Sequence, residues 1–347
     1  MNKKIRLGWV GSGFVGQVAH LNCYSYFKNI EIVGLAELRP SLGNKICKKH
    51  SIKKYYKNHL DLMNNEKLDA IVAIVNRKHT ALVAEDILRK GINLFTEKPM
   101  AATYKQALKL FNLAKKNKCS YVIGNMRLHD SGVKLGKKYY DNFIKKKSLG
   151  RLLYFRSYCY AGGDYCNVDG YTPTNEKRPN KYLLPNAPSW VKKNKKKEFE
   201  KFLNYFSHDI NLINYFFNEE PSISNFELRK YAGNVTLNYK DFFGTFEFMY
   251  LHHQESWKEG LEIYFEKGCI KIYLPPAFLK NQPAKVEIYN ENKSILKEIP
   301  ESEWSWSFKN QAENFIKIIK NKKVNHLSAY NSLNDIKIIE KIWKKLQ

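Results

Sequence analysis

The sequence predicts an α/β protein in two parts: a doubly wound parallel sheet, then an α+β domain with an open, mostly antiparallel sheet. Continuous apolar runs alternate with helical patterns in the first part, and after about Gly150 the strands alternate apolar with polar residues. The chain of 347 residues is also long for one core. We expect domains at 1–127 and 128–306, with C-terminal helices at 307–347 packing back toward the first domain.

Each predicted strand of the first part is a short apolar run, as expected for a sheet covered on both faces. The runs are IRLGWV, IEIVGLAE, LDAIVAIV, INLFTE and CSYVIG. Between them we expect a helix ending at about Phe27, one starting at Pro40 and one over about His79–Lys90. A further helix runs to about Lys118, with Thr103 as its N-cap.

The second part opens on the alternating strand LLYFRSYCY and continues with an irregular stretch at about 161–197. An irregular stretch of that length is often functional. We expect a helix at about 199–217, and C-terminal helices at about 307–321 and 328–345. The antiparallel strands between them are SNFELRKY, NVTLNY, FGTFEFMYLHH, LEIYFEKGCIKIYL (with EKGC as a hairpin turn) and KVEIYN.

The composition limits the classes of binding partner that we expect. The net charge is +26, from 59 Lys+Arg against 33 Asp+Glu, but the lysines are scattered and greatly outnumber the arginines. We interpret them as solvated surface and expect no specific nucleic-acid partner. The six cysteines form no C-x-x-C, so we expect no metal site. Without a signal peptide or a long apolar run, we expect a cytoplasmic protein with no membrane partner.

A glycine motif follows the first predicted strand. Gly11, Gly13 and Gly16 form G-x-G-x-x-G between a strand and a helix, which is the context that a dinucleotide site requires. Such glycines allow a tight turn, an approach of the pyrophosphate to the backbone, and close packing of helix on strand. The intervening Ser12, Phe14 and Val15 are therefore candidate cofactor-binding residues.

The second strand ends at Glu37, about 20 residues after the last glycine, where an acid holds the adenosine ribose hydroxyls. A carboxylate at this place repels a 2′-phosphate, which favours NAD as the cofactor. Arg39 follows two residues later and is suited to accept that phosphate, so NADP stays possible.

Lys98 follows the fourth apolar run directly, between Glu97 and Pro99. Ligands of doubly wound sheets bind at the carboxyl ends of the strands, and Pro99 restricts Lys98 to extended conformations. An amine placed there can hold a substrate hydroxyl and polarise the carbonyl that forms from it.

These features resemble the Gfo/Idh/MocA family of oxidoreductases. The resemblance rests on GSGFVG with Glu37, on NRKHTALVAEDILRKGINLFTEKPMAATYKQAL and on FLNYFSHDINLINYFF. It implies a Rossmann domain and a second domain whose open sheet often builds dimers or tetramers, here a homodimer or homotetramer. It also implies hydride transfer between a nicotinamide and a carbon of a sugar, cyclitol or nucleotide-sugar.

The resemblance assigns roles to residues that match the family's motifs. Lys98 would be the catalytic lysine, with Glu97 beside it at the cofactor. Asn76 and His79 match polar positions that line the cofactor, although Ile74 and Val75 replace the usual Thr-Pro.

Further along the chain, Asn125 and Arg127 lie near the expected nicotinamide and substrate. The family's D-x-x-x-H reads Asn204-x-x-x-His208 here, so His208 would be the general base. Asn204 cannot titrate and would orient by hydrogen bonds.

Several further residues are candidates for contact with the substrate. Asn204, His208 and Asn211 share one helical face, and an apolar stripe faces elsewhere (Leu203, Phe206, Ile210, Ile213, Phe217). Tyr205, His129 and Arg178 complete the set, and Arg178 suits a carboxylate or a nucleotide-sugar phosphate. We expect Asp209 to be structural, Asp130 to cap a helix, and His252 and His253 to bind no metal.

Two alternatives share the fold. In one, the enzyme oxidises and re-reduces its substrate within a turnover and leaves NAD unchanged, as a glycosidase-like or epimerase-like protein. In the other, suggested by Asn204 and the charge, the protein is a non-catalytic nucleotide sensor or a polyanion-binding module.

Overall fold

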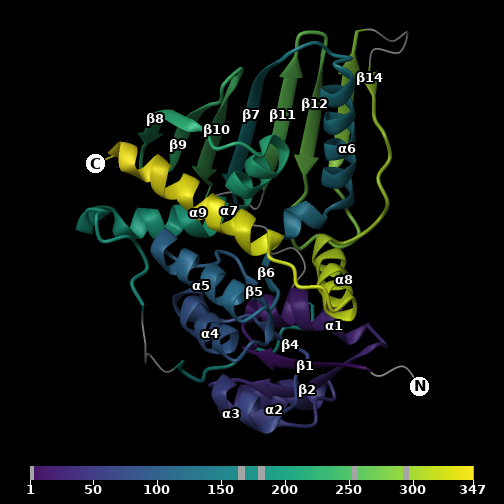
Figure 1. Ribbon diagram of the computed structural model, residues 1–347, viewed down its shortest axis with the longest axis vertical. Coiled ribbons are helices and arrows are strands. Elements are labelled where there is room, and N and C mark those ends of the chain that lie inside the picture. Colours follow the sequence, from purple (N-terminus) through teal and green to yellow (C-terminus); the bar gives the residue numbers. More distant parts are fainter. Residues whose placement is uncertain (1–3, 163–168, 179–183, 252–256, 292–296, 347) are drawn as a thin grey trace. The chain divides into compact units, whose positions relative to one another are not determined.

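The computed structural model describes residues 4–162, 169–178, 184–251, 257–291 and 297–346 (Figure 1). The chain divides into two compact units. Unit 1 comprises Met1–Gly124, Val168–Glu200 and Gln311–Ile336, and unit 2 comprises Asn125–Asn167, Lys201–Asn310 and Lys337–Gln347. The division at 127 and 306 expected from the sequence stays a prediction. His252 and His253 lie outside the described residues.

Unit 1 contains a parallel sheet, which confirms the predicted doubly wound architecture. Its strand order is β3-β2-β1-β4-β5-β6. The strands are β1 (Ile5–Val10), β2 (Ile30–Ala36), β3 (Tyr55–Tyr56), β4 (Ala70–Ala73), β5 (Asn93–Glu97) and β6 (Tyr121–Gly124). The sequence did not predict β3 or the following helix α3 (His59–Asn65), because a strand of two residues has no periodic pattern to recognise.

The other helices of this unit lie close to their expected places. They are α2 (Pro40–Lys49), α4 (Arg77–Arg89) and α5 (Tyr104–Lys116). Thr103 caps α5 as predicted, since its hydroxyl accepts a hydrogen bond from the Gln106 amide at 3.2 Å. The helix predicted after the glycine turn is instead a π-helix, η1 (Gly16–Leu21), followed by one turn of α-helix, α1 (Asn22–Ser25).

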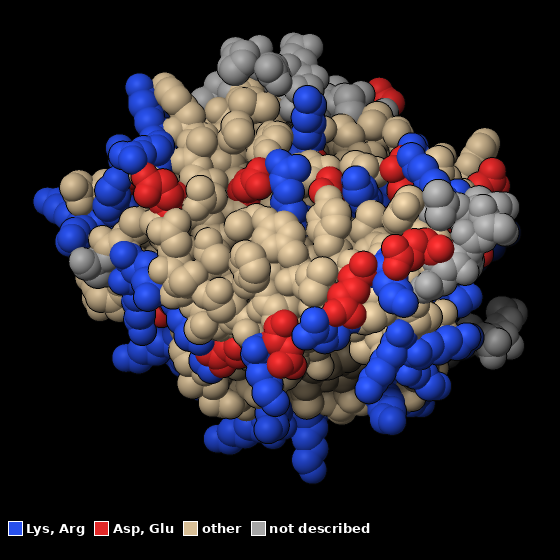
Figure 2. Space-filling model, turned by 90° about the horizontal axis from the view of Figure 1, so that it is seen from above, with Lys and Arg blue, Asp and Glu red and all other residues tan. Residues whose placement is uncertain are grey.

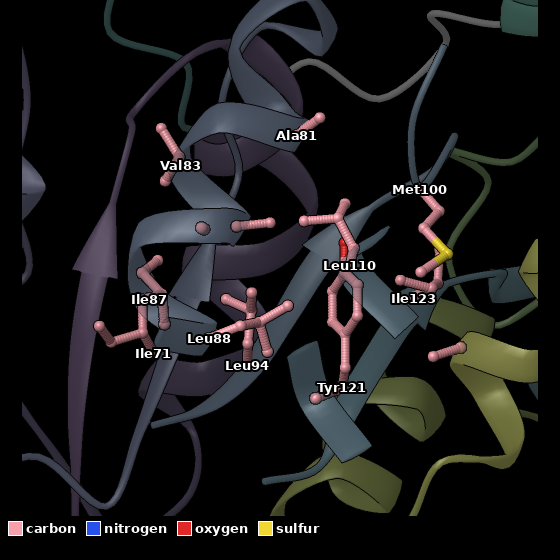
Figure 3. Close-up of a cluster of buried hydrophobic side chains, with 14 of the residues drawn as sticks. Ile71, Ala81, Val83, Ile87, Leu88, Leu94, Met100, Leu110, Tyr121 and Ile123 are labelled. Carbon is pink, nitrogen blue, oxygen red and sulfur yellow. The ribbon is translucent and has the colours of Figure 1, made fainter. Parts of the chain in front are cut away.

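Apolar side chains between the helices and the sheet hold this unit together. Ile87 and Leu88 of α4 lie next to Ile71 of β4 and Leu94 of β5 (Figure 3), and all four are completely buried. Burying one such side chain stabilises a fold by about 1.5–3 kcal/mol. The cluster fixes the strands, and therefore their carboxyl ends, where a cofactor would bind.

Unit 2 is built on an eight-stranded sheet of order β14-β13-β12-β11-β7-β10-β9-β8. Its described pairings are antiparallel except that of β10 with β7, so the predicted open, mostly antiparallel sheet is confirmed. The strands are β7 (Leu152–Ala161), β8 (Ser222–Leu228), β9 (Ala232–Asn238), β10 (Phe243–Tyr250), β11 (Lys258–Phe265), β12 (Gly268–Leu274), β13 (Lys285–Asn290) and β14 (Lys297–Glu298).

One face of this sheet is covered by helices. α6 (Ser131–Lys146) packs on β12 and β13, and the aromatic residues of α7 (Lys196–Phe217) pack on β7 and β10. Asp130 caps α6 as expected, since its carboxylate accepts from the amides of Gly132 and Val133. The helices at the carboxyl end are α8 (Ser307–Lys320) and α9 (Leu327–Trp343).

The charged side chains are dispersed. Figure 2 shows Lys and Arg side chains around the margin of one face, with Asp and Glu among them and a mostly uncharged middle. In the described part of the chain, no helix is long and apolar enough to cross a membrane. The same described residues contain no group of acidic, His and Cys side chains placed to hold a metal ion.

Candidate active site

The glycine turn of unit 1 has the shape that a dinucleotide requires. Gly11 has a φ of +86°, and a Cβ on it would lie 2.4 Å from the Ile74 carbonyl oxygen. A Cβ on Gly16 would lie 3.4 Å from the Gly11 oxygen, at the close contact of helix and strand. Gly11 is therefore needed by the fold itself, whereas a Cβ on Gly16 would only reach van der Waals contact with the turn.

Gly13 differs from Gly11. A Cβ on it would approach only the end of the Arg178 side chain, at 3.4 Å, so packing does not require a glycine there. The missing side chain leaves the backbone of the turn accessible at the start of η1, as close approach of a pyrophosphate demands. The turn therefore fits a dinucleotide.

Glu37 joins the glycine turn to the start of α2. It is 5% exposed. Its carboxylate accepts from the Ser12 amide at 2.8 Å and the Ser12 hydroxyl at 2.7 Å. Arg39 donates to the same carboxylate from Nε at 2.8 Å and from Nη2 at 3.0 Å. Burial opposes ionisation, but these bonds outweigh it and lower the pKa of Glu37, so an ionised acid lies where the ribose is expected.

Lys98 lies at the carboxyl end of β5, as predicted. The preceding Glu97 accepts from the Lys98 amide at 3.0 Å and pairs with Nε2 of His20 at 2.7 Å. His20 belongs to η1 and is 1% exposed, so this contact ties the Glu97–Lys98–Pro99 turn to the helix that follows the glycine motif. The Lys98–Pro99 peptide is cis, and Lys98 is half-buried.

His20 was missed by the sequence analysis. It lies in the middle of a predicted helix and carries no motif of its own. Only the fold brings it to Glu97, from a place 77 residues away in the chain.

Asn76 and His79 lie at the start of α4. Asn76 is exposed, and its side-chain oxygen accepts from the Lys78 amide at 3.1 Å as the N-cap of that helix. His79 is half-buried in the first turn. The preceding Ile74 supplies the carbonyl that lies against Gly11. The side-chain oxygen of Asn76 therefore caps α4, which leaves its side-chain NH₂ group as the part that could contact a cofactor.

The candidate residues of α7 lie in unit 2. The apolar stripe is confirmed, since Leu203, Phe206, Ile210 and Ile213 are buried, while Phe217 stacks obliquely on Phe155. Asn204, Tyr205 and His208 are partly exposed, whereas Asn211 is 2% exposed. The three residues that share a face in the sequence pattern therefore differ in access to solvent.

Arg127, expected near the substrate, has its guanidinium inside unit 2. It is 3% exposed and forms a bidentate salt bridge with the Glu259 carboxylate. It also donates a hydrogen bond to the Pro275 carbonyl at 2.8 Å. Trp257 donates to the same carboxylate at 2.7 Å. These contacts use Arg127 for structure within this unit.

The two candidates beside Arg127, which are His129 of the 3₁₀-helix η2 (Met126–His129) and Asn125 before it, are uncharged near pH 7. Burial, aided by Lys134, lowers the pKa of His129 to about 4, so this imidazole is neutral near pH 7. Asn125 is 6% exposed at the start of the same short helix.

Residues 169–178 belong to unit 1 and lie on its glycine turn. The Thr172 amide donates to the Gln17 side chain at 2.8 Å, and that side chain donates back to the Thr172 carbonyl at 3.2 Å. Tyr171 contacts Phe14 edge-on, with ring centroids 5.2 Å apart. Arg178 therefore lies at Gly13 of the glycine turn, although the sequence suggested a role toward substrate.

A cavity of about 540 Å³ lies elsewhere in unit 1, among the amino-terminal ends of β1 and β5. Lys4, Lys118 and Asp69 are among its lining residues. Because cofactors of doubly wound sheets bind at the carboxyl ends of the strands, this cavity is not the candidate site.

The parallel sheet, the open glycine turn and the buried acid after β2 define a dinucleotide-binding domain. Residues 5–125 match the model of the Gfo/Idh/MocA oxidoreductase family, described as an NAD-binding Rossmann fold. The chain carries the NAD-binding Rossmann domain of the Gfo/Idh/MocA oxidoreductase family. The match of these residues implies binding of NAD(P).

Curated relatives include the inositol 2-dehydrogenases of Salmonella paratyphi B and Salmonella typhimurium. Each is 25% identical to this chain over 130 residues, which are 37% of this chain and 39% of the relative. The match thus spans well under half of the length of these relatives and shows distant homology.

Solved structures share the fold over nearly the whole chain. The 3-ketoreductase KijD10 from Actinomadura kijaniata, in complex with TDP-benzene and NADP, is 15% identical with a TM-score of 0.75, covering 98% of this chain and 96% of that one. A putative NADPH-dependent oxidoreductase from Desulfitobacterium hafniense is 12% identical with a TM-score of 0.79, covering 100% and 96%. A dehydrogenase from Clostridium difficile is 17% identical with a TM-score of 0.72, covering 99% and 100%.

Proposed function

We propose that this protein is an NAD(P)-dependent oxidoreductase that transfers a hydride between the nicotinamide and a hydroxyl or keto carbon of a sugar, cyclitol or nucleotide-sugar. The observation that carries the proposal is the Glu97–Lys98–Pro99 turn at the carboxyl end of β5. Glu97 is anchored to His20 of η1, so Lys98 is held at the same sheet edge as the glycine turn.

Lys98 has the chemistry that the reaction needs. Its ammonium can donate hydrogen bonds to a substrate oxygen and stabilise the charge that develops on it. We assign the proton transfer to His208, whose imidazole can take up a hydroxyl proton as the carbon is oxidised. Asn204 would orient the substrate by hydrogen bonds. The bound cofactor would supply the acceptor or donor of the hydride.

The substrate class rests on relatives. Inositol 2-dehydrogenases are named for a cyclitol, and KijD10 was captured with a TDP derivative. Partly exposed Asn204, Tyr205 and His208 provide hydrogen-bonding groups of the kind that hydroxyl-rich ligands engage. We therefore favour a small hydroxylated substrate over a macromolecule.

Lys98→Met tests this proposal. The purified protein is supplied with NAD⁺ and a panel of polyols and sugars, and net formation of reduced nicotinamide is followed by its absorbance. Loss of a positioned acid–base group should lower kcat by about 10²–10⁴-fold. Gln106→Met, in the first turn of α5, is a control that should stay near wild type. Turnover of Lys98→Met within about 10-fold of wild type would remove Lys98 from the mechanism.

The same assay separates the alternative chemistry. Product formation without net accumulation of reduced nicotinamide would mean a redox-neutral cycle. Binding of dinucleotide with no turnover across the panel would favour a sensor. A steep salt dependence of nucleic-acid binding would favour the polyanion-binding alternative, because phosphate contacts release counterions.

We further propose self-association through the outer face of the unit 2 sheet. Tyr154, Tyr158 and Tyr160 of β7 lie on this face and are only half-buried. Arg156 is held between them by Glu247 of β10, with two contacts of 2.8 Å. Aromatic side chains and pre-ordered arginines are enriched at interfaces. Sedimentation should show a dimer or tetramer, and Tyr158→Glu should shift it toward monomer.

A further inference from the structure

The segment 169–178 extends from the glycine turn to the start of α2. At one end Thr172 binds Gln17, and Lys49 donates to the Gly170 carbonyl. At the other end Glu176 reaches α2, so this segment borders both ends of the adenosine part of the expected cofactor site. No motif in the sequence assigns it a task there.

Glu176 binds the first turn of α2. Its carboxylate accepts from the Ser41 amide at 3.0 Å and from the Leu42 amide at 2.7 Å. Pro40 has no N–H, and the N-cap Arg39 makes no side-chain capping bond, so Glu176 satisfies the first two amides of this helix. Exposed amides at such a helix end are where a phosphate would otherwise bind.

Arg39, the N-cap residue of α2, is also paired with a carboxylate. Arg39 donates through Nε and Nη2 to Glu37, at 2.8 and 3.0 Å. A 2′-phosphate on the adenosine ribose needs N–H groups and a cation, and the first amides of α2 and the Arg39 guanidinium are already engaged by carboxylates. A ribose hydroxyl, by contrast, carries no charge, so the carboxylates of Glu37 and Glu176 do not repel it.

A hollow of about 460 Å³ opens beside this contact. It is lined by Ser41 and Lys45 of α2 and by residues 173–176. Removing the Glu176 carboxylate would leave Lys45 and the two amides of α2 at this hollow, with the charge of Arg39 close enough to act on the same place. This is the donor set that a phosphate prefers.

We propose that Glu176 is a specificity-determining residue, which makes the site select NAD over NADP by occupying the helix end and repelling a 2′-phosphate. The inference rests on the proposed function, because it assumes that the domain binds NAD(P). It goes beyond the usual acid after β2, since the deciding carboxylate comes from a segment more than 130 residues further along the chain.

The test measures equilibrium binding and needs no substrate. NAD⁺ and NADP⁺ are titrated separately into wild type, Glu176→Gln and Glu176→Ala by calorimetry. Gln keeps the shape and removes the charge, whereas Ala also releases the two amides. The matched control is Glu85→Gln, which removes a carboxylate of α4 in unit 1 that pairs with Arg89 and Lys109.

Wild type should bind NAD⁺ more tightly than NADP⁺. Glu176→Gln should tighten NADP⁺ binding and so lower the ratio of the NADP⁺ dissociation constant to the NAD⁺ dissociation constant by about 10-fold. Glu176→Ala should lower this ratio further. Glu85→Gln should leave the ratio unchanged.

A ratio within about 2-fold of wild type in both Glu176 variants would overturn the inference, as would an equal loss of both affinities, which a merely structural cap would cause. A wild type that binds NADP⁺ more tightly also refutes it and leaves the proposed function intact. A wild type that binds neither dinucleotide overturns the proposed function itself.

Discussion

Asp209 of α7 is expected to make the stability of unit 2 fall as the pH rises. Its carboxyl group is 1% exposed and lies near the buried Glu259, Arg127 and Cys159. The donors of Arg127 and Trp257 are directed to Glu259, and the charge of Arg127 only partly offsets the cost of ionising Asp209. Burial, aided by the charge of Glu259, raises the pKa of Asp209 well above its ordinary value.

The sign follows from proton uptake. The unfolded chain loses this proton above about pH 3.9, whereas the folded chain keeps it up to the raised pKa. In that window the folded state binds more protons, so the free energy of unfolding falls by about 1.4 kcal/mol per pH unit. Asp209→Asn removes this dependence, because an amide keeps the shape and does not titrate.

Urea unfolding followed by tryptophan fluorescence measures the effect. Between about pH 5 and pH 7, the stability of Asp209→Asn relative to wild type should rise with pH, by at most about 1.4 kcal/mol per pH unit while folded wild type keeps the proton. Asp141→Asn on α6 is the control, since that carboxylate is 57% exposed and paired with Lys137. A difference between Asp209→Asn and wild type that stays constant across this range would refute the reasoning.

Three further substitutions test the buried Arg127–Glu259 pair and the glycine turn. Arg127→Met should lower the free energy of unfolding by about 3–5 kcal/mol in urea titrations, because it leaves the Glu259 carboxylate buried without its cation; an effect below about 1 kcal/mol would contradict that assignment. Gly11→Ala and Gly13→Ala form a matched pair. Alanine at Gly11 meets the Ile74 carbonyl and a positive φ and should destabilise the fold, whereas alanine at Gly13 should leave the unfolding midpoint nearly unchanged and weaken NAD⁺ binding at least about 10-fold in calorimetry. Equal effects of the two on stability would contradict the distinction.

Local sequence patterns predicted the strands of unit 1, the glycine turn and the position of Lys98. The strands of unit 1 are buried on both faces and therefore read as continuous apolar runs, and Gly11, Gly13 and Gly16 lie between a strand and a helix as their spacing requires. Lys98 was placed correctly at the end of β5 because Pro99 and the preceding apolar run mark that end. Each of these features is local in the sequence, so the sequence alone contains it.

The contacts that complete the site are not local. His20 meets Glu97, Glu176 meets the amides of α2, and Arg127 meets Glu259 across separations from 77 to 135 residues. Polar pairs of this kind have no period, and a lysine-rich surface provides many equally plausible partners for every acid. Only the packed fold selects one partner, which is why the sequence alone did not place Arg178 at the glycine turn.

The acidic residues, which are fewer, therefore say more about the position of a site than the abundant basic residues do. The chain has 33 acidic residues against 59 basic ones, and four of the acids fix the groups discussed above. Glu37 is held by Ser12 and Arg39, Glu97 holds the turn that presents Lys98, and Glu176 closes the end of α2. Glu259 neutralises Arg127 inside unit 2. A buried or chelated carboxylate must repay its desolvation with specific donors, so its position is tightly determined, whereas a solvated lysine can lie almost anywhere on the surface. In a chain with so many basic residues, the carboxylates that accept several hydrogen bonds are the best guide to where a site lies.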